Sequence, residues 1–178
     1  EEDRGREPPQ REEAQEVGER HAPEPQVREA ALGDDAAHQR PVRVVGIGCS
    51  TGGPGPLARL LSALPKRLAA PVLVSQHIEE AFTPGLVDWL SRESGVLVAV
   101  AQAGQRPESG HVYLARGGRH NLLLRSGWHL DYEPSGNAIY YPNINRMLGS
   151  IAEVAGAAAC GGGVVGTGNA AARPVFLA

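Results

Sequence analysis

Apolar residues along this chain follow two alternating patterns: short continuous runs, and longer stretches with an apolar residue every three or four positions. The continuous runs at 42–47, 71–75 and 96–100 are rich in valine, and the first two stop at glycine or polar residues. Runs of this length and composition predict buried strands. Helical spacing fills the intervals between them, so the order strand, helix, strand, helix, strand predicts a parallel sheet with helices on its faces.

Two amphipathic helices are expected in these intervals. The apolar face of the first consists of four leucines at helical spacing, Leu57, Leu60, Leu61 and Leu64, and Pro65 helps to end it. The second begins at Thr83 and Pro84, which suit a helix N-cap and a first helical position. Its inner face carries Leu86, Trp89 and Leu90.

The second half of the chain departs from this alternation. Short apolar runs lie at 111–115 and 121–125, and a Ser-Gly pair joins the latter to 128–132 as a predicted hairpin. A helical stripe follows, made of Ile144, Met147, Leu148, Ile151 and Val154, and then a strand at 160–165. The predicted fold class is therefore α/β: a three-layer, doubly wound, mostly parallel sheet with a small antiparallel hairpin excursion.

The first 40 residues have a different composition from the rest. They are rich in Glu, Arg, Gln, Pro and Ala and almost lack large apolar side chains. Such a segment cannot bury enough surface to offset its ordering entropy, which predicts a disordered tail or interdomain linker at 1–40. The folded domain is expected at 41–178, and its alanine- and glycine-heavy end indicates that this domain is incomplete at its C-terminus.

Charge and composition limit the classes of partner that the chain is expected to bind. Residues 1–40 hold 12 acidic and 6 basic residues, whereas 41–178 hold 8 acidic and 11 basic residues. The mildly basic folded part suits an acidic protein surface but is too weakly charged to indicate nucleic acid. No apolar run reaches about 18 residues, and no signal peptide is apparent, so no membrane insertion is expected. Two cysteines without metal-ligand spacing agree with a cytoplasmic, metal-free protein.

The candidate chemistry begins where the first predicted strand ends. Gly48-x-Ser50-x-Gly52 has the spacing of a nucleophile elbow, in which a serine occupies a tight turn between strand and helix. The alternatives are a glycine-rich turn without chemistry and a phosphate loop. A serine needs a base, and His77 follows the second predicted strand. Consecutive parallel strands end at the same edge of a sheet, so the two side chains are expected to meet there.

A set of motifs in this chain closely resembles the CheB family, the chemotaxis receptor protein-glutamate methylesterases. The motifs are Gly-x-Gly-x-Ser-Thr-Gly-Gly-Pro at 46–54, Val-Leu-Val-x-Gln-His at 72–77, Phe-Thr at 82–83, Gly-His-Val-Tyr-Leu-Ala at 110–115 and Gly-Gly-Arg-His at 117–120. The resemblance covers 42–168. It implies a three-layer α/β hydrolase that needs no cofactor, demethylates glutamate methyl esters on a chemoreceptor, and also hydrolyses amidated glutamines.

The resemblance also implies roles for particular residues. Ser50 matches the family's nucleophile, and His77 matches the residue that acts first as general base and then as general acid. Backbone amides around Thr51, together with Thr167, are expected to face the oxyanion. Arg119 is expected to meet the acidic receptor helix.

Three departures from the family's pattern are visible. The loop after the last predicted strand contains no acid, and Ala172 occupies the position of the family's aspartate. The segment 142–145 reads Pro-Asn-Ile-Asn where the family has Pro-Ser-Val-Asp. The family's C-terminal elements and its receiver domain are absent from this sequence.

Two alternative functions remain open on the sequence alone. Loss of the orienting aspartate costs roughly 10⁴-fold in turnover, so a catalytically impaired homologue that binds a receptor or signalling partner is one alternative. The remote alternative is a nucleotide-binding domain that uses Gly46-x-Gly48 as its phosphate turn. This second alternative is weakened because Thr51 stands where the motif needs its third glycine.

Overall fold

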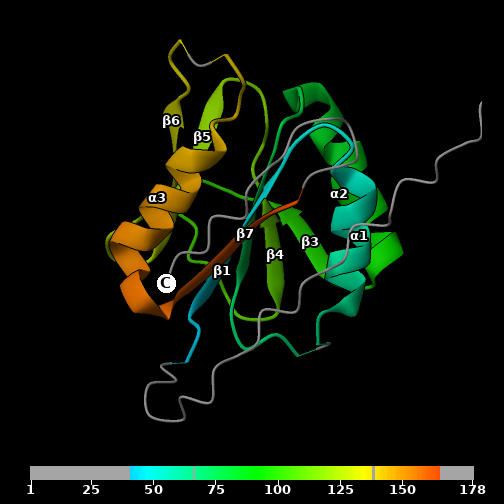
Figure 1. Ribbon diagram of the computed structural model, residues 1–178, viewed down its shortest axis with the longest axis horizontal. Helices are drawn as coiled ribbons and strands as arrows, with labels where there is room; N and C mark the ends of the chain where they lie inside the picture. Colours follow the sequence, from blue (N-terminus) through cyan, green and yellow to red (C-terminus); the bar gives the residue numbers. More distant parts are fainter. Residues whose placement is uncertain (1–40, 66, 138, 165–178) are drawn as a thin grey trace, which may run out of the picture. The chain divides into compact units, whose positions relative to one another are not determined.

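A computed structural model describes residues 41–65, 67–137 and 139–164 of the protein (Figure 1). The predicted tail at 1–40 and the residues that follow 164 lie outside the described residues. None of the helices in the described part of the chain combines the length and the apolar composition needed to cross a membrane.

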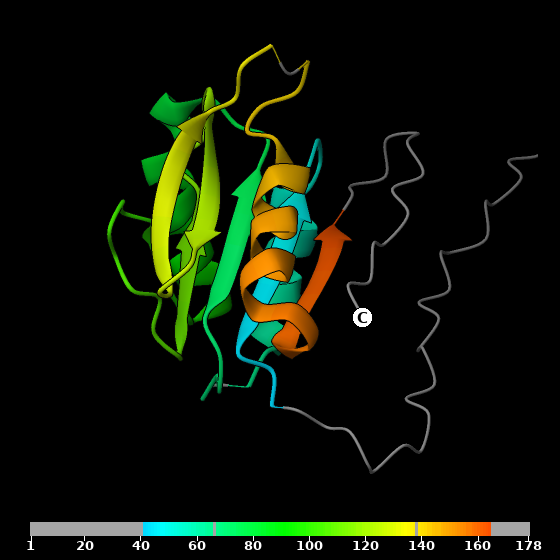
Figure 2. The ribbon, with the colours of Figure 1, turned by 90° about the vertical axis from the view of Figure 1, so that its left-hand side faces the viewer.

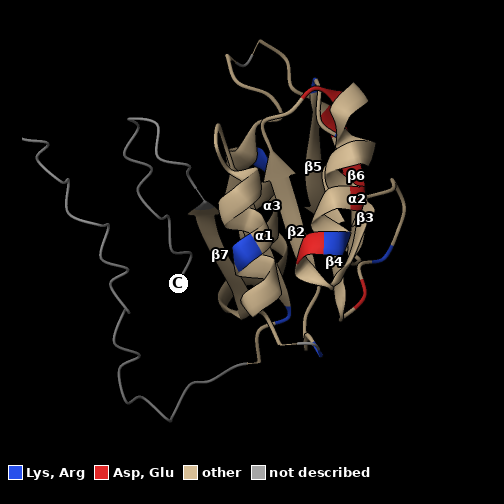
Figure 3. Cartoon of the chain, turned by 90° about the vertical axis from the view of Figure 1, so that its right-hand side faces the viewer, with Lys and Arg blue, Asp and Glu red and all other residues tan. Residues whose placement is uncertain are grey.

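The centre of the fold is a five-stranded sheet with the order β3-β4-β2-β1-β7, in which every pairing is parallel. The strands are β1 (Val44–Cys49), β2 (Val72–Gln76), β3 (Leu97–Val100), β4 (His111–Leu114) and β7 (Ala159–Val164). None of the five contains Asp, Glu, Lys or Arg, and the charged residues coloured in Figure 3 lie outside these strands. Uncharged parallel strands of this kind are covered on both faces.

The described elements form three layers, as Figures 1 and 2 show. Helices α1 (Pro54–Ala63) and α2 (Thr83–Ser94) cover one face of the sheet, whereas α3 (Ile144–Ala155) and the antiparallel hairpin of β5 (His120–Arg125) and β6 (His129–Pro134) cover the other. Two short 3₁₀ turns, η1 (Glu80–Phe82) and η2 (Gly156–Ala158), complete the structure. The α/β fold class predicted from the sequence is confirmed.

Strand β4 differs from the expectation. The run at 111–115 was expected to accompany the antiparallel excursion, but β4 is inserted between β3 and β2 with parallel pairing on both sides. The physical reason is its burial on both faces. Val112 and Leu114 pack in the core beneath α1 and α2, while Tyr113 packs in the core beneath α3 and the hairpin. Only a strand inside the sheet can bury both sets of side chains.

Strand β1 alternates between the two cores, and its glycines face α3. Ile47 and Cys49 point into the core shared with α1 and α2. On the opposite face, a Cβ atom added to Gly46 would lie 2.8 Å from side-chain atoms of Leu148 and Ile151, and one added to Gly48 would collide with Ile144. Close helix packing therefore accounts for both glycines without a phosphate ligand, which removes the main support for a nucleotide-binding domain.

Replacing Gly48 by alanine is expected to destabilise the fold by about 1–3 kcal/mol, because the new methyl group overlaps the Cγ2 methyl group of Ile144, which is attached next to the helix backbone. Urea unfolding followed by circular dichroism measures the change. The matched control is Gly149→Ala on α3, where a Cβ meets nothing within 4 Å. The control is expected to gain about 0.5–1 kcal/mol from helix propensity. Equal stability of Gly48→Ala and the parent chain would contradict the packing argument.

The start of α2 also differs from the expectation. Thr83 was predicted to be the N-cap, but it is the first helical residue, and Phe82 occupies the N-cap without a side-chain hydrogen bond. The Thr83 hydroxyl instead donates to the backbone carbonyl of Arg116 at 2.8 Å. Gly118 N–H likewise donates to the carbonyl of Ile78 at 2.8 Å. These bonds tie the loop after β4 to the loop after β2, and Thr83 serves this tertiary link in place of the cap.

Candidate active site

Ser50 and His77 follow the carboxyl ends of two adjacent parallel strands. The pairing of β1 with β2 sets Cys49 opposite Gln76, and the His77 N–H donates to the Cys49 carbonyl at 3.0 Å. Both next residues therefore leave the sheet at the same edge. Ser50 Oγ lies 3.0 Å from His77 Nδ1, within hydrogen-bond distance.

The turn that carries Ser50 is held by short-range contacts. The Ser50 carbonyl accepts a hydrogen bond from Gly53 N–H at 2.8 Å. Gly53 is the N-cap of α1, and a Cβ atom there would lie 2.7 Å from the Ser50 carbonyl oxygen. Only glycine fits this approach without moving the turn. Thr51 lies exposed in the same turn, between Ser50 and the amino end of α1.

Gln76 connects the two loops through its side chain. Its amide Nε2 donates to the carbonyls of both Ser50 and His77, each at 3.1 Å. The side chain is buried, and its Oε1 has no hydrogen-bond partner in the described part of the chain. The sequence motif contains Gln76, but its role as a bridge between the two turns becomes visible only in the structure.

The imidazole of His77 is half-buried and lies against a loop from the other face of the sheet. The ring of Tyr140 stacks on it with 5.7 Å between centroids and 18° between planes. Burial lowers the pKa of His77 below its ordinary 6.5, and a hydrogen bond with the Pro142 backbone partly opposes that shift. A lowered pKa keeps the imidazole neutral at neutral pH, which is the form that can accept a proton from serine.

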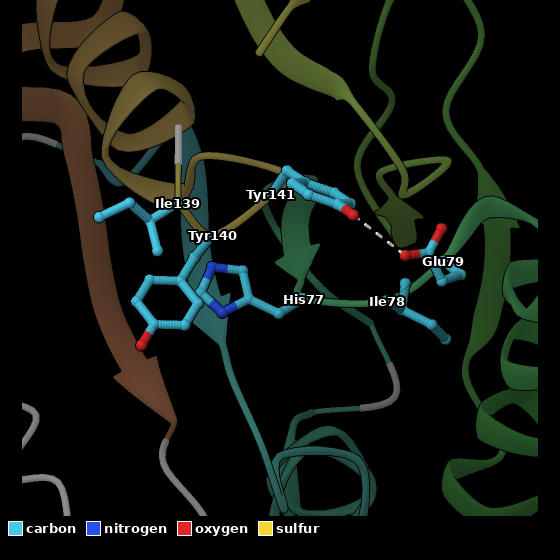
Figure 4. Close-up of a pocket in the computed structure, with 6 residues that line it drawn as sticks. All are labelled: His77, Ile78, Glu79, Ile139, Tyr140 and Tyr141. Carbon is cyan, nitrogen blue, oxygen red and sulfur yellow. Dashed lines mark hydrogen bonds between the residues drawn. The ribbon is translucent and has the colours of Figure 1, made fainter. Parts of the chain in front are cut away.

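A pocket of about 300 Å³ opens beside His77 (Figure 4). It is lined by His77, Ile78, Glu79, Ile139, Tyr140 and Tyr141. The Tyr141 hydroxyl donates to Glu79 at 3.3 Å, and the Arg119 guanidinium lies 4.7 Å from the centre of the Tyr141 ring. Arg119 therefore stands at the rim of the pocket. The sequence does not predict the lining from 139–141, because a loop has no periodicity and an adjacent pair of tyrosines is its only signal.

The start of α3 anchors this loop. Asn143 is the N-cap of α3, and its Oδ1 accepts from the N–H groups of Asn145 and Arg146. Its own N–H donates to Asn121 Oδ1 of the hairpin at 2.7 Å. The asparagine thus performs the capping for which serine is also suited. The departure from Pro-Ser-Val-Asp preserves a capped helix directly after the residues that contact His77.

Two of the predicted site residues, Thr167 and Ala172, lie outside the described residues. Among the residues that are described, no Asp or Glu forms an ion pair with His77. Within the same ranges, no group of three or more His, Cys, Asp or Glu residues could hold a metal ion.

A serine hydroxyl beside a neutral imidazole, at the carboxyl edge of a parallel sheet, is the arrangement of an α/β serine hydrolase. A sequence model of the CheB methylesterase family matches residues 45–173. The chain belongs to this family.

Relatives and a solved structure agree with this assignment. Two proteins named protein-glutamate methylesterase/protein-glutamine glutaminase 1 are similar to the chain. The one from Cupriavidus pinatubonensis is 40% identical over 62% of this chain and 33% of its own length. The one from Pseudomonas fluorescens is 33% identical over 82% of this chain and 47% of its own length. The catalytic domain of the Thermotoga maritima CheB methylesterase has a TM-score of 0.61 and 30% identity, covering 68% of this chain and 66% of that one.

The chain thus spans from about a third to about a half of the length of the curated relatives it matches.

Proposed function

We propose that this chain hydrolyses the methyl esters of glutamate side chains on the cytoplasmic helices of a chemoreceptor, as a step in chemotaxis adaptation. Hydrolysis of glutamine side-chain amides at the same site is part of the proposal. The observation that supports it best is the distance of 3.0 Å between Ser50 Oγ and His77 Nδ1. In this proposal residues 41–178 form the catalytic part, and 1–40 form a tail or a linker to a receiver domain.

The chemistry follows from the two side chains. The hydroxyl oxygen of Ser50 attacks the ester carbonyl, and its proton moves to His77 Nδ1. The tetrahedral intermediate expels methoxide, which takes that proton and leaves as methanol. Water then attacks the acyl-serine while His77 again accepts a proton, which returns to Ser50 as the acyl bond breaks. The glutamic acid side chain that is released loses its proton to solvent and becomes a carboxylate.

The proposal assigns stabilisation of the oxyanion to backbone amides around Thr51 and to Thr167, and attraction of the receptor to Arg119. Backbone amides around Thr51, with Thr167, are proposed to donate to the oxyanion, where each well-aimed donor contributes roughly 3 kcal/mol. Arg119 at the pocket rim is proposed to attract the acidic surface of the receptor helix. Its guanidinium packs on Tyr141, which lines the same pocket as His77.

A second candidate function is receptor binding without turnover. It is favoured by one observation, the alanine at position 172 where the family has its aspartate. Without a carboxylate to stabilise the imidazolium, turnover is expected to fall by roughly 10⁴-fold, while the serine, the imidazole and the receptor-facing surface remain.

Methanol release from a receptor fragment with methyl-labelled glutamates tests the proposal. The full chain is expected to release labelled methanol above the rate of spontaneous ester hydrolysis, and an unmethylated fragment serves as the blank in the same assay. A parallel measurement of binding to the two fragments separates the candidates. Binding without methanol release establishes the second candidate, and the absence of both overturns the proposal.

A further inference from the structure

The imidazole of His77 is contacted from two directions. Ser50 Oγ lies at its Nδ1 edge. The ring of Tyr140 covers one of its faces, as Figure 4 shows. The separation of 5.7 Å and the interplanar angle of 18° fall in the range of offset aromatic stacking. Tyr140 is nevertheless 72% exposed. A large aromatic ring that remains mostly in water while touching a candidate base is not explained by core packing.

The loop that carries Tyr140 is fixed on both sides of the contact. Tyr141 is engaged by Glu79 and Arg119, and Pro142 is buried beside the capped start of α3. Tyr140 therefore does not depend on its own contact with His77 to keep its place. The stacking ring is presented to the imidazole by an independently anchored segment.

A general base needs this kind of restraint. Hydrogen bonds to the Ser50 hydroxyl and to the Pro142 backbone act at the edge of the ring and leave the imidazole free to tilt out of its plane. A misplacement of about 1 Å in a reacting group can cost roughly 10²-fold in rate. A flat ring against one face limits these motions without consuming a ring nitrogen.

We propose that Tyr140 is a positioning residue for His77: its ring holds the imidazole in the orientation in which Nδ1 faces Ser50. This inference rests on the proposed function only in taking Ser50 and His77 as the catalytic pair. Tyr140 acts through the face of its ring and transfers no proton, so its hydroxyl is dispensable.

The stack also shields His77 from water. Burial is the main cause of the lowered pKa of His77, and the Tyr140 ring covers one of the two faces of the imidazole. The charged groups on the neighbouring loops, Glu79 and Arg119, both contact Tyr141. Removing the Tyr140 ring re-exposes the imidazole, so the pKa of His77 is expected to rise toward 6.5.

Three variants of the full chain test the proposal: Tyr140→Phe, Tyr140→Leu and Tyr140→Ala. Tyr140→Phe is expected to keep kcat within about twofold, whereas Tyr140→Ala lowers kcat by about tenfold with a smaller change in KM. The acid limb of the pH–rate profile moves to higher pH in the alanine variant and stays in place in the phenylalanine variant. Phe82→Ala is the matched control, because Phe82 is 67% exposed and lies outside the pocket.

A measurement without turnover separates this inference from the proposed function. Titration of the His77 ring nitrogens by NMR, assigned with a His77→Gln sample, reports the pKa in each variant whether or not the ester is hydrolysed. A raised pKa in Tyr140→Ala and Tyr140→Leu, but not in Tyr140→Phe or Phe82→Ala, supports the positioning role. An unchanged titration in both ring-less variants overturns it, and so does an equal loss of kcat in the phenylalanine variant. If Tyr140→Ala fails to fold, the leucine variant decides.

Discussion

Replacing Ser50 by alanine is expected to remove methanol release almost completely, with a loss in kcat of about 10⁴- to 10⁶-fold. The reason is that in the proposed mechanism Ser50 supplies the oxygen that forms the acyl intermediate, and no other hydroxyl stands within hydrogen-bond distance of His77 in the described part of the chain. In this variant a water molecule can still attack the ester directly with help from the oxyanion donors. The rate of that residual reaction sets the size of the loss. The assay is release of labelled methanol from the methylated receptor fragment.

The fold is expected to survive this change. Ser50 Oγ makes one hydrogen bond, to His77, while the turn itself is held by backbone contacts and by Gln76. Circular dichroism and receptor binding should therefore match the parent chain. Ser62→Ala is the matched control, because Ser62 is an exposed serine on α1 that bonds only its own helix. Methanol release that persists in Ser50→Ala and not in a boiled sample contradicts the assignment of the nucleophile.

The second large effect is expected for His77→Gln. Glutamine keeps a polar side chain of similar length but cannot accept and return the serine proton, so kcat is expected to fall by about 10⁴-fold or more. In the proposed mechanism serine and histidine act as one unit, so the double variant Ser50→Ala/His77→Gln is expected to lose little beyond the larger single effect. Additive losses in the double variant would mean that the two side chains work independently.

The pH dependence of the rate tests the assignment of His77 as the general base. The base must be neutral, and burial lowers the pKa of His77 below 6.5. In the parent chain the rate is therefore expected to fall as the pH drops through a value below 6.5, where the imidazole gains a proton. The residual activity of His77→Gln should lack this acid limb. Retention of the limb in that variant would identify another group as the titrating base.

The meeting of Ser50 and His77 could be predicted because it depends on a general rule. Adjacent parallel strands end at one edge of a sheet, and both residues follow short, valine-rich runs that predict buried strands. The glycines of β1 are visible in the sequence as a motif, but the packing that requires them is not. The α3 side chains that they accommodate lie about a hundred residues further along the chain.

The remaining features depend on contacts that local sequence does not encode. The local sequence groups β4 with the hairpin region. Its pairing with β2 is not visible there, because η1, α2 and β3 separate the two strands along the chain. The local pattern at Thr83 predicts an N-cap, but its hydroxyl donates instead to the Arg116 carbonyl in the loop after β4. Tyr140 reaches His77 across the top of the sheet from a loop without periodicity. These contacts assemble the pocket beside the predicted pair.

The bridge formed by Gln76 has a consequence for the motion of the site. One rigid amide group is bonded to the main chain of both the serine turn and the histidine turn. A displacement of either turn is therefore expected to be transmitted to the other, so that the two turns move together. The distance between the Ser50 hydroxyl and the His77 imidazole is then expected to fluctuate less than the position of either turn. The proposed chemical step depends on that relative distance, so the loops could adjust to the receptor of the proposed function while the reacting atoms keep their spacing.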